Sequence, residues 1–163
     1  MREIAGIHHV AVSTPDLAVA RRFYVDLLGA EEVEAFEWGE GAAAIDAIVG
    51  LKDSAARQFM VRLGNAYIEV FEYLAPRSPP QDPRRPVNLF GYTHLALQVS
   101  DIDAVYKRMV AAGVEFHAPP QHFGGADAAD GRKRGLKATY GRDFFGNAFE
   151  LLEINEGAST PAL

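Results

Sequence analysis

Hydrophobic and polar residues alternate over residues 7–13, a pattern typical of a β-strand with two different faces. Over residues 17–28 the apolar positions instead recur every three or four residues, which predicts an amphipathic helix. Thr14-Pro15-Asp16 offers a cap residue, a proline for the first helical position and an acid for the first turn, and Gly29 can end the helix. Three strands are predicted after this helix, at residues 31–38, 57–63 and 66–74, with an insertion or short helix at 41–54.

The second half of the chain repeats this order of elements. His94-Leu95-Ala96-Leu97 resembles His9-Val10-Ala11-Val12, and residues 146–153 resemble residues 64–72. A capping-box-like start at residues 100–103 predicts a second helix that ends at Gly113. Strands are then expected at residues 114–118, 136–142 and 147–154. Two matched blocks in the same order predict an α+β fold built from two βαβββ modules.

The predicted organisation is one two-module domain. The first module covers residues 1–75, a Pro-rich linker covers 76–90, the second module covers 91–155, and 156–163 form a C-terminal tail.

Strand alternation decides which side chains share a face. His9 and His94 lie on the first strand of each copy, and Glu69 and Glu150 lie on the last, all with mainly apolar neighbours. A buried carboxylate without a partner is costly, and four such groups are the donors that a divalent cation needs. A single strand histidine is more often a structural residue than a ligand, and a strand glutamate usually faces water. Because both residue types repeat at matching positions, the sequence favours a metal site.

Other polar residues receive weaker assignments. Glu72 and Glu153 also repeat, but on the opposite parity, so we interpret them as solvent-facing or salt-bridged. His8 should point away from His9 and lie beside the site or at the surface. His117 and His122 fall in a Pro/Gly-rich loop that could approach a substrate.

Composition limits the function classes. A formal charge of −6 argues against a nucleic-acid surface, and the one basic cluster, residues 132–134, reads as a solvated loop or the binding site of an anionic substrate tail. The absence of cysteine excludes disulfides and thiolate ligands. No apolar run is long enough to span a membrane and no signal peptide is evident, so a cytoplasmic protein is expected.

The motifs at residues 7–12, 91–96 and 140–150 resemble those of the vicinal oxygen chelate superfamily, which includes glyoxalase I, methylmalonyl-CoA epimerase, extradiol dioxygenases and bleomycin-resistance proteins. The resemblance extends from Gly6 to about Ile154. It implies an open, curled, eight-stranded barrel-like sheet around a metal, with His9, Glu69, His94 and Glu150 as ligands. Phe144 departs from the family pattern, in which proline usually follows the Asp, and this should alter a turn only.

Three functions follow from this resemblance. The first is an isomerase, epimerase or lyase in which a divalent metal (Zn, Ni, Co, Mn or Fe) stabilises an enolate while Glu150 or Glu69 moves the proton. The second is an Fe(II) extradiol dioxygenase with His9, His94 and Glu150 as a facial triad. The third is a ligand-binding or resistance protein without catalysis.

The expected partner is a small molecule, anionic or bearing vicinal oxygens, with no nucleic acid and no membrane. Tyr140, His122 and Gln98 are the candidate substrate contacts, although Tyr140 also suits simple packing. A homodimer is expected, and the metal site can form within one chain or across two.

Overall fold

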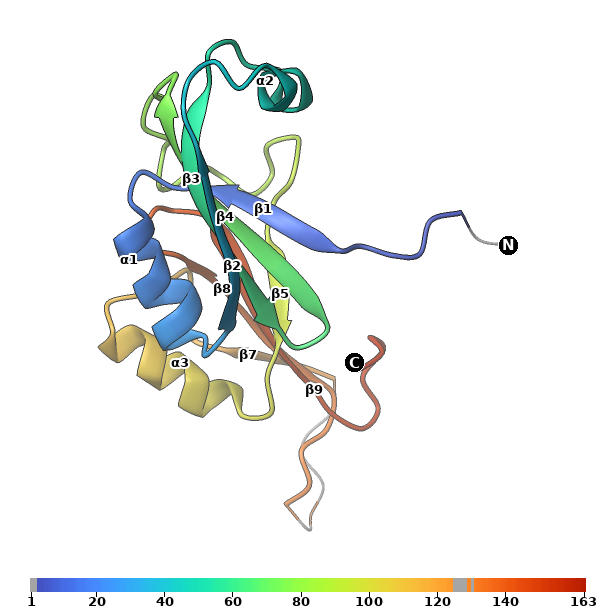
Figure 1. The fold of residues 1–163 in the computed structure, drawn as a ribbon. Helices are drawn as coiled ribbons and strands as arrows, with labels where there is room; N and C mark the ends of the chain where they lie inside the picture. Colours follow the sequence, from blue (N-terminus) through green and yellow to red (C-terminus); the bar gives the residue numbers. More distant parts are fainter. Residues whose placement is uncertain (1–2, 125–128, 130) are drawn as a thin grey trace. The chain divides into compact units, whose positions relative to one another are not determined.

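Each half of the chain folds around its own β-sheet in this computed structural model, which describes residues 3–124, 129 and 131–163 (Figure 1). The chain divides into two units, Met1–Pro80 and Gln81–Leu163. The first unit has the order β-α-β-α-β-β and the second the order β-α-β-β-β-β, so each is a βαβββ module with one added element, and the predicted α+β class and the duplication are confirmed. Within the described part of the chain, no helix is both long and apolar enough to cross a membrane.

The first unit contains a four-stranded sheet in the order β1-β4-β3-β2. Strand β1 runs parallel to β4, whereas the other neighbours are antiparallel. All three strands predicted after the helix are present, and the insertion contains a short helix. The elements are β1 (His9–Ser13), α1 (Leu17–Arg21), η1 (Arg22–Leu27), β2 (Glu31–Trp38), α2 (Ala43–Val49), β3 (Ala55–Leu63) and β4 (Ala66–Ala75).

The first helix begins two residues later than the Thr14 cap predicted. Asp16 is the N-cap, and its carboxylate accepts hydrogen bonds from the N–H groups of Ala18 and Val19 at 2.8 and 3.1 Å. The Thr14 hydroxyl donates instead to the carbonyl oxygen of Phe71. After Arg21 the helix widens to π geometry in η1, and Gly29 ends it with a φ of 72° as expected.

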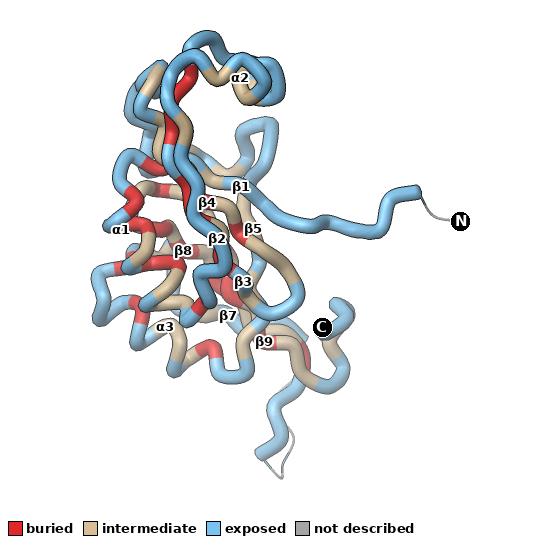
Figure 2. Tube along the Cα trace, in the orientation of Figure 1, coloured by how far each residue is buried: buried red, intermediate tan, exposed pale blue. Residues whose placement is uncertain are grey.

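The helix covers one face of the first sheet, and the other face stays available for a site. Leu17, Ala20, Phe23 and Tyr24 are buried on the helix, and Phe59, Val61, Ile68 and Val70 are buried on the sheet (Figure 2). The guanidinium of Arg21 lies 4.5 Å from the ring centre of Phe59, a cation–π contact between the helix and the sheet. His9 and Glu69 therefore project from the face of the sheet that the helix does not cover.

The second unit has a five-stranded sheet with the path β5-β9-β8-β6, and β7 also pairs with β8. Pro119 and Pro120 separate β6 from β7, since proline cannot donate to a strand ladder. The strand predicted at 114–118 is thus shorter, and the described residues form nine strands in two sheets instead of eight in one. The elements are β5 (Leu95–Gln98), α3 (Ile102–Ala111), β6 (Glu115–Phe116), β7 (Gln121–Phe123), β8 (Leu136–Arg142) and β9 (Ala148–Ile154).

Glu72 and Glu153 anchor the two helices to their sheets. Glu72 accepts a hydrogen bond from the N–H of Leu17, the first residue of α1, and forms an ion pair with Arg57. Glu153 accepts one from the N–H of Ile102, the first residue of α3. Both carboxylates are mostly buried, so the solvent-facing interpretation was wrong and the salt-bridged one is confirmed.

Candidate metal centre

The first unit brings His9 and Glu69 together. Strands β1 and β4 are parallel neighbours, and their register pairs Ala11 with Glu69. His9 lies two residues before Ala11 and so projects from the same face as Glu69. The imidazole Nε2 lies 3.4 Å from a carboxylate oxygen of Glu69, and both side chains are partly exposed.

The second unit repeats this arrangement with His94 and Glu150. Strands β5 and β9 are parallel, and Ala96 pairs with Glu150 just as Ala11 pairs with Glu69. The Nε2 of His94 lies 3.2 Å from a carboxylate oxygen of Glu150. The duplication of the sequence therefore extends to the geometry of the two pairs.

In each unit, the residue that precedes the histidine contacts its other ring nitrogen. The Nδ1 atoms of His8 and His9 are 3.0 Å apart, and the Thr93 hydroxyl lies 2.9 Å from Nδ1 of His94. His8 also stacks on Tyr67, with ring centres 4.9 Å apart. The prediction that His8 points away from His9 was wrong, because strand alternation applies only within β1, which starts at His9.

The chemistry of the two pairs fits a divalent cation. Contacts at Nδ1 leave Nε2 of each histidine directed at a carboxylate, and imidazole nitrogen with carboxylate oxygen is a donor set for Zn, Mn, Fe, Co or Ni. The described residues contain no group of three or more His, Asp or Glu side chains that could hold a metal ion. The structure therefore brings the predicted ligands together as two separate His–Glu pairs, one in each unit.

Tyr140, His117 and Arg142 extend the face around His94 and Glu150. The Tyr140 hydroxyl lies 3.4 Å from Nε2 of His94, and the two rings are 4.5 Å apart. The ring centres of His117 and Tyr140 are 6.1 Å apart. Arg142 donates from Nε to Nε2 of His117 at 3.1 Å, and it also donates to the carbonyl oxygens of Gly146 and Arg85.

These contacts set the protonation of two side chains. Burial raises the pKa of Tyr140, and the charge of Glu150 raises it further, so the phenol keeps its proton at neutral pH. Burial lowers the pKa of His117, and the guanidinium of Arg142 lowers it further. With Arg142 donating to Nε2, a neutral His117 carries its proton on Nδ1. The face therefore presents two neutral hydrogen-bond donors beside the His94–Glu150 pair.

Sequence patterns point to His117 only as part of a Pro/Gly-rich loop, and they do not point to Arg142. Both lie on the face of Tyr140, because β6 and β8 pair Glu115 with Arg142 and His117 donates its backbone N–H to the Tyr140 carbonyl. The pairing of an edge segment with β8 could have been expected from alternation alone. Its register could not, since Pro119-Pro120 interrupts the pattern.

The other two predicted substrate contacts lie elsewhere. His122 pairs with Lys137 on β8, a position of opposite parity to Tyr140, and its Nε2 lies 2.6 Å from the carbonyl oxygen of Arg134. Gln98 shares the parity of His94, but its side-chain oxygen accepts a hydrogen bond from the N–H of Leu163. Of the three candidates, only Tyr140 lies beside a His–Glu pair.

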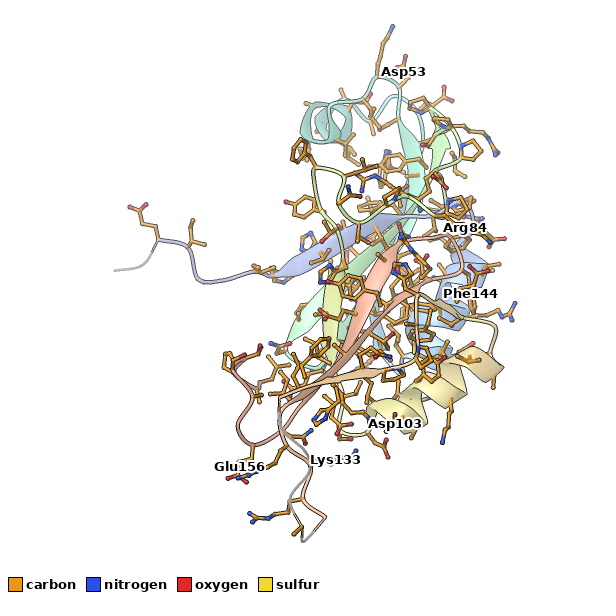
Figure 3. The ribbon with its side chains drawn as sticks, turned by 180° about the vertical axis from the view of Figure 1, so that it is seen from behind. Asp53, Arg84, Asp103, Lys133, Phe144 and Glu156 are labelled. Carbon is orange, nitrogen blue, oxygen red and sulfur yellow. The ribbon has the colours of Figure 1, made fainter. Side chains whose placement is uncertain are left out.

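The basic cluster at residues 132–134 is committed to nearby acids. Lys133 forms an ion pair with Glu153 at 2.9 Å, and Arg132 lies 3.6 Å from Glu156 (Figure 3, where Lys133 and Glu156 are labelled). Arg134 also pairs with Glu156. These contacts favour a structural role for the cluster over an anion site.

A depression in the first unit lies apart from its His–Glu pair. It has a volume of about 480 Å³ and is lined by residues of α1, β2 and β3 that include Arg21, Glu37 and Arg57. Neither His9 nor Glu69 lines it. The paired donors, and not this depression, therefore identify the candidate site.

Residues 6–151 match the family described as the Glyoxalase/Bleomycin resistance protein/Dioxygenase superfamily. Because the match covers most of the chain, the protein belongs to this superfamily. The fold agrees: a glyoxalase family protein from Bacillus cereus superposes with a TM-score of 0.75 at 22% identity, over 96% of this chain and 99% of that one. A fosfomycin resistance protein of Listeria monocytogenes, solved with Mn(II), has a TM-score of 0.55 at 22% identity, over 91% of each chain.

Relatives of similar sequence include epimerases. A 2-epi-5-epi-valiolone epimerase from an Actinomyces species is 32% identical over 161 residues, which are 94% of this chain and 81% of the relative. Mouse mitochondrial methylmalonyl-CoA epimerase is 29% identical over 102 residues, 63% of this chain and half of the relative.

Proposed function

We propose that this protein is a divalent-metal-dependent epimerase or isomerase that moves a proton on a carbon next to a carbonyl group. The observation that carries the proposal is the repeated pair: in both units a histidine Nε2 lies within 3.4 Å of a glutamate carboxylate oxygen. The epimerases among the relatives support this reaction class over the alternatives.

His9, Glu69, His94 and Glu150 would hold the metal. Carboxylate oxygens and the Nε2 atoms of neutral imidazoles are donors that a divalent cation accepts. When bound, the metal supplies Lewis acidity that stabilises the negative charge on the oxygen of an enolate. The set can be completed within one chain or by two chains of a homodimer.

The chain's own residues would carry the proton. One of the two glutamates, Glu150 or Glu69, takes the proton from the carbon and leaves the electron pair delocalised onto the carbonyl oxygen. For epimerisation, a protonated carboxylic acid then returns a proton to the opposite face of the same carbon. Two glutamates from two equivalent strands offer one base and one acid, so that atoms and charge balance without any further reactant.

Tyr140 and His117 suit the orientation of a substrate. The phenol keeps its proton, and His117 offers an N–H, so both can donate to oxygens of a polar small molecule. Neither group has to change its charge during the reaction. We assign them to binding and not to proton transfer.

Exchange of the α-proton with solvent deuterium tests the proposed reaction. Protein reloaded with Zn, Ni, Co, Mn or Fe(II) is incubated in D₂O with ring ketones, 2-oxo acids, hemithioacetals and acyl-CoA thioesters, and deuterium at the α-carbon is followed by NMR. We expect exchange with at least one class and about one metal ion per chain by elemental analysis. His9→Ala and His94→Ala should each lose both.

Three results would overturn the proposal. If the reloaded wild type holds no metal, or holds the same amount as His9→Ala and His94→Ala, the ligand assignment is wrong. If no substrate exchanges while the anaerobically prepared Fe(II) form consumes oxygen with catechols, the protein is an extradiol dioxygenase. Retained binding of a ligand without exchange in any metal form would instead indicate a non-catalytic binding protein.

A further inference from the structure

Two arginines of the second unit are half-buried and lack an acidic partner among the described residues. Across the described part of the chain, the half-buried lysines and arginines are Arg21, Arg85, Lys137 and Arg142. Arg21 pairs with Glu32 and Lys137 with Asp103, whereas the other two form no ion pair with any described carboxylate. A positive charge that is partly removed from water is unfavourable without a charge of opposite sign nearby. These two guanidinium groups are therefore candidates for binding a negatively charged ligand.

Neutral acceptors hold the guanidinium of Arg142 in place. Its Nε, Nη1 and Nη2 atoms donate to Nε2 of His117 and to the carbonyl oxygens of Gly146 and Arg85, at 3.1, 2.9 and 2.8 Å. A guanidinium has five N–H groups, so two remain after these three hydrogen bonds to described residues. The acceptors fix the group without cancelling its charge, which after burial is the second cause of the lowered pKa of His117. Arg142 thus offers a fixed positive charge and two further donors.

Arg85 lies next to the segment that leads into β5. Its Nη2 donates to the carbonyl oxygen of Phe90 at 3.0 Å and lies 3.9 Å from the point where a side chain on Gly91 would begin. Gly91 comes shortly before His94 in the sequence. Because the Arg85 carbonyl accepts from Arg142, the backbone of one arginine contacts the side chain of the other.

Arg142 lies on the same face of the second sheet as the His94–Glu150 pair. The β8–β9 register pairs Tyr140 with Glu150 and Arg142 with Ala148, so both β8 side chains project from the face that carries Glu150. Along that face Arg142 is two residues from the position of Glu150, a spacing of about 7 Å on a strand. A short carbon chain can therefore connect a metal held by the pair with the guanidinium.

One further carboxylate faces Arg142 across the sheet. Glu115 on β6 pairs with Arg142 in the register, but Glu115 is exposed, and the described residues contain no ion pair between the two. Glu150 on β9 is a proposed metal ligand, so we do not count it as a partner of Arg142. The positive charge is thus left for a ligand, with Glu115 as a partial competitor.

We infer that Arg142, with Arg85 beside it, binds a carboxylate at the far end of the substrate, which makes the substrate a 2-oxo dicarboxylic acid. A carboxylate matches a guanidinium in charge and geometry, and its two oxygens can accept the two remaining N–H groups. The carbonyl and carboxylate at the other end supply neighbouring oxygens to the metal. This inference rests on the proposed function, because the carbonyl makes the adjacent C–H acidic, and it names the substrate class of the same site.

Calorimetric titration of the metal-loaded protein tests the charge at the far end of the ligand. The ligands are 2-oxoglutarate, its longer homologue 2-oxoadipate, and the 5-methyl ester of 2-oxoglutarate. The ester keeps the chain and the metal-binding end but lacks the second charge. We expect at least one of the two diacids to bind about 10-fold more tightly than the ester, because only a diacid forms the charge-assisted hydrogen bonds to Arg142.

Variants separate a ligand-binding role of Arg142 from a structural one. Arg142→Met should weaken the binding of the diacid about 10- to 100-fold and leave that of the ester unchanged, and Arg142→Lys should restore part of the loss. A structural role would instead weaken both ligands alike. Glu115→Gln removes the opposing carboxylate and should strengthen diacid binding. Arg84→Met is the matched control, because Arg84 is exposed (labelled in Figure 3) and its loss should change neither affinity.

The inference is wrong if neither diacid binds more tightly than the ester, if Arg142→Met weakens both ligands equally, or if Glu115→Gln weakens the diacid. These measurements need no turnover, and the metal content of each variant is determined separately. If the diacid binds in an Arg142-dependent manner but its α-proton does not exchange in D₂O, the proposed reaction is wrong and the carboxylate subsite stands. If diacid and ester exchange equally and Arg142→Met changes neither, the reaction stands and the subsite is wrong.

Discussion

The Thr93 hydroxyl lies 2.9 Å from Nδ1 of His94 and holds the ring from the side opposite to Glu150. His8 makes the corresponding contact with His9 in the first unit, at 3.0 Å. A partner on one ring nitrogen fixes the tautomer and orientation of a histidine that binds a metal through the other. The two units thus use different residue types for the same task.

Thr93→Val should weaken metal binding while leaving the fold intact. The substitution conserves the shape of the side chain but removes the oxygen that contacts His94 Nδ1, and loss of such a partner typically costs about 10- to 100-fold in metal affinity. Competition with a chelator of known affinity measures the change. Thr93→Ser keeps a hydroxyl and should retain most of the affinity. An unchanged affinity in Thr93→Val would mean that the contact does not orient the ring.

Replacement of the candidate bases should reduce turnover more than metal content. Glu150→Gln conserves size and an oxygen atom but removes the charge and the base, and loss of general-base catalysis costs about 10²–10⁴-fold. Glu69→Gln should do the same if Glu69 moves the proton, and less if it only binds the metal. The rate of α-proton exchange is measured together with the metal content of each variant. Full activity in both variants would exclude proton transfer by either glutamate.

Arg142→Met should raise the pKa of His117. Burial and the adjacent guanidinium both hold this pKa below the ordinary histidine value, so the neutral form persists to lower pH than in a free histidine. Removal of the positive charge leaves only the effect of burial. An NMR titration of the imidazole signals measures the shift, and Arg108→Met, on the solvent side of α3, is the control. A pKa that stays constant or falls would contradict the Arg142 contact.

Much of the fold follows from local patterns in the sequence. The strands at residues 31–38 and 136–142 were predicted with the bounds that the structure shows, because long alternating segments flanked by glycine leave few options. The cap of α1 was misplaced because Thr14 and Asp16 are both good cap residues, and only the contact of Thr14 with Phe71 decides between them. Strand β7 was missed because three residues between a Pro-Pro pair and a glycine carry almost no periodic signal.

The His–Glu pairs could be predicted because duplication places them at equivalent strand positions. The residues that contact these pairs could not be predicted from the sequence. The contact of His8 with His9 depends on the backbone just before β1, and the approach of His117 to Arg142 depends on the register of an edge strand. Likewise, nothing in the local sequence around Gln58 indicates that its side-chain oxygen receives no hydrogen bond from the described residues, which depends on the packing of β2 and β4.

Stability in acid should depend on Glu153. Its side chain is 1% exposed. Burial raises the pKa of Glu153, but hydrogen bonds from the Ile102 N–H, Lys133 and Asn155 lower it by more. The net result is a pKa below that of an ordinary glutamate. The folded state therefore holds this proton less tightly than the unfolded chain. The stabilisation is fully present above the unfolded pKa, about 4.3, and is lost as the pH falls through the folded value.

Glu153→Gln should consequently lower the free energy of unfolding at pH 7 by about 1.5–3 kcal/mol, the range for hydrogen bonds to a charged group, and the difference from the wild type should shrink below about pH 4. Urea denaturation between pH 3 and 7 measures both effects. Glu156→Gln is the matched control, because Glu156 pairs with Arg132 and Arg134 but is 61% exposed, and exposed ion pairs contribute at most about 1 kcal/mol. Since Glu153 holds the first residue of α3, its loss should also speed hydrogen exchange at the N-terminus of that helix. Equal stability of Glu153→Gln and the wild type at pH 7 would show that this carboxylate does not anchor α3 to β9.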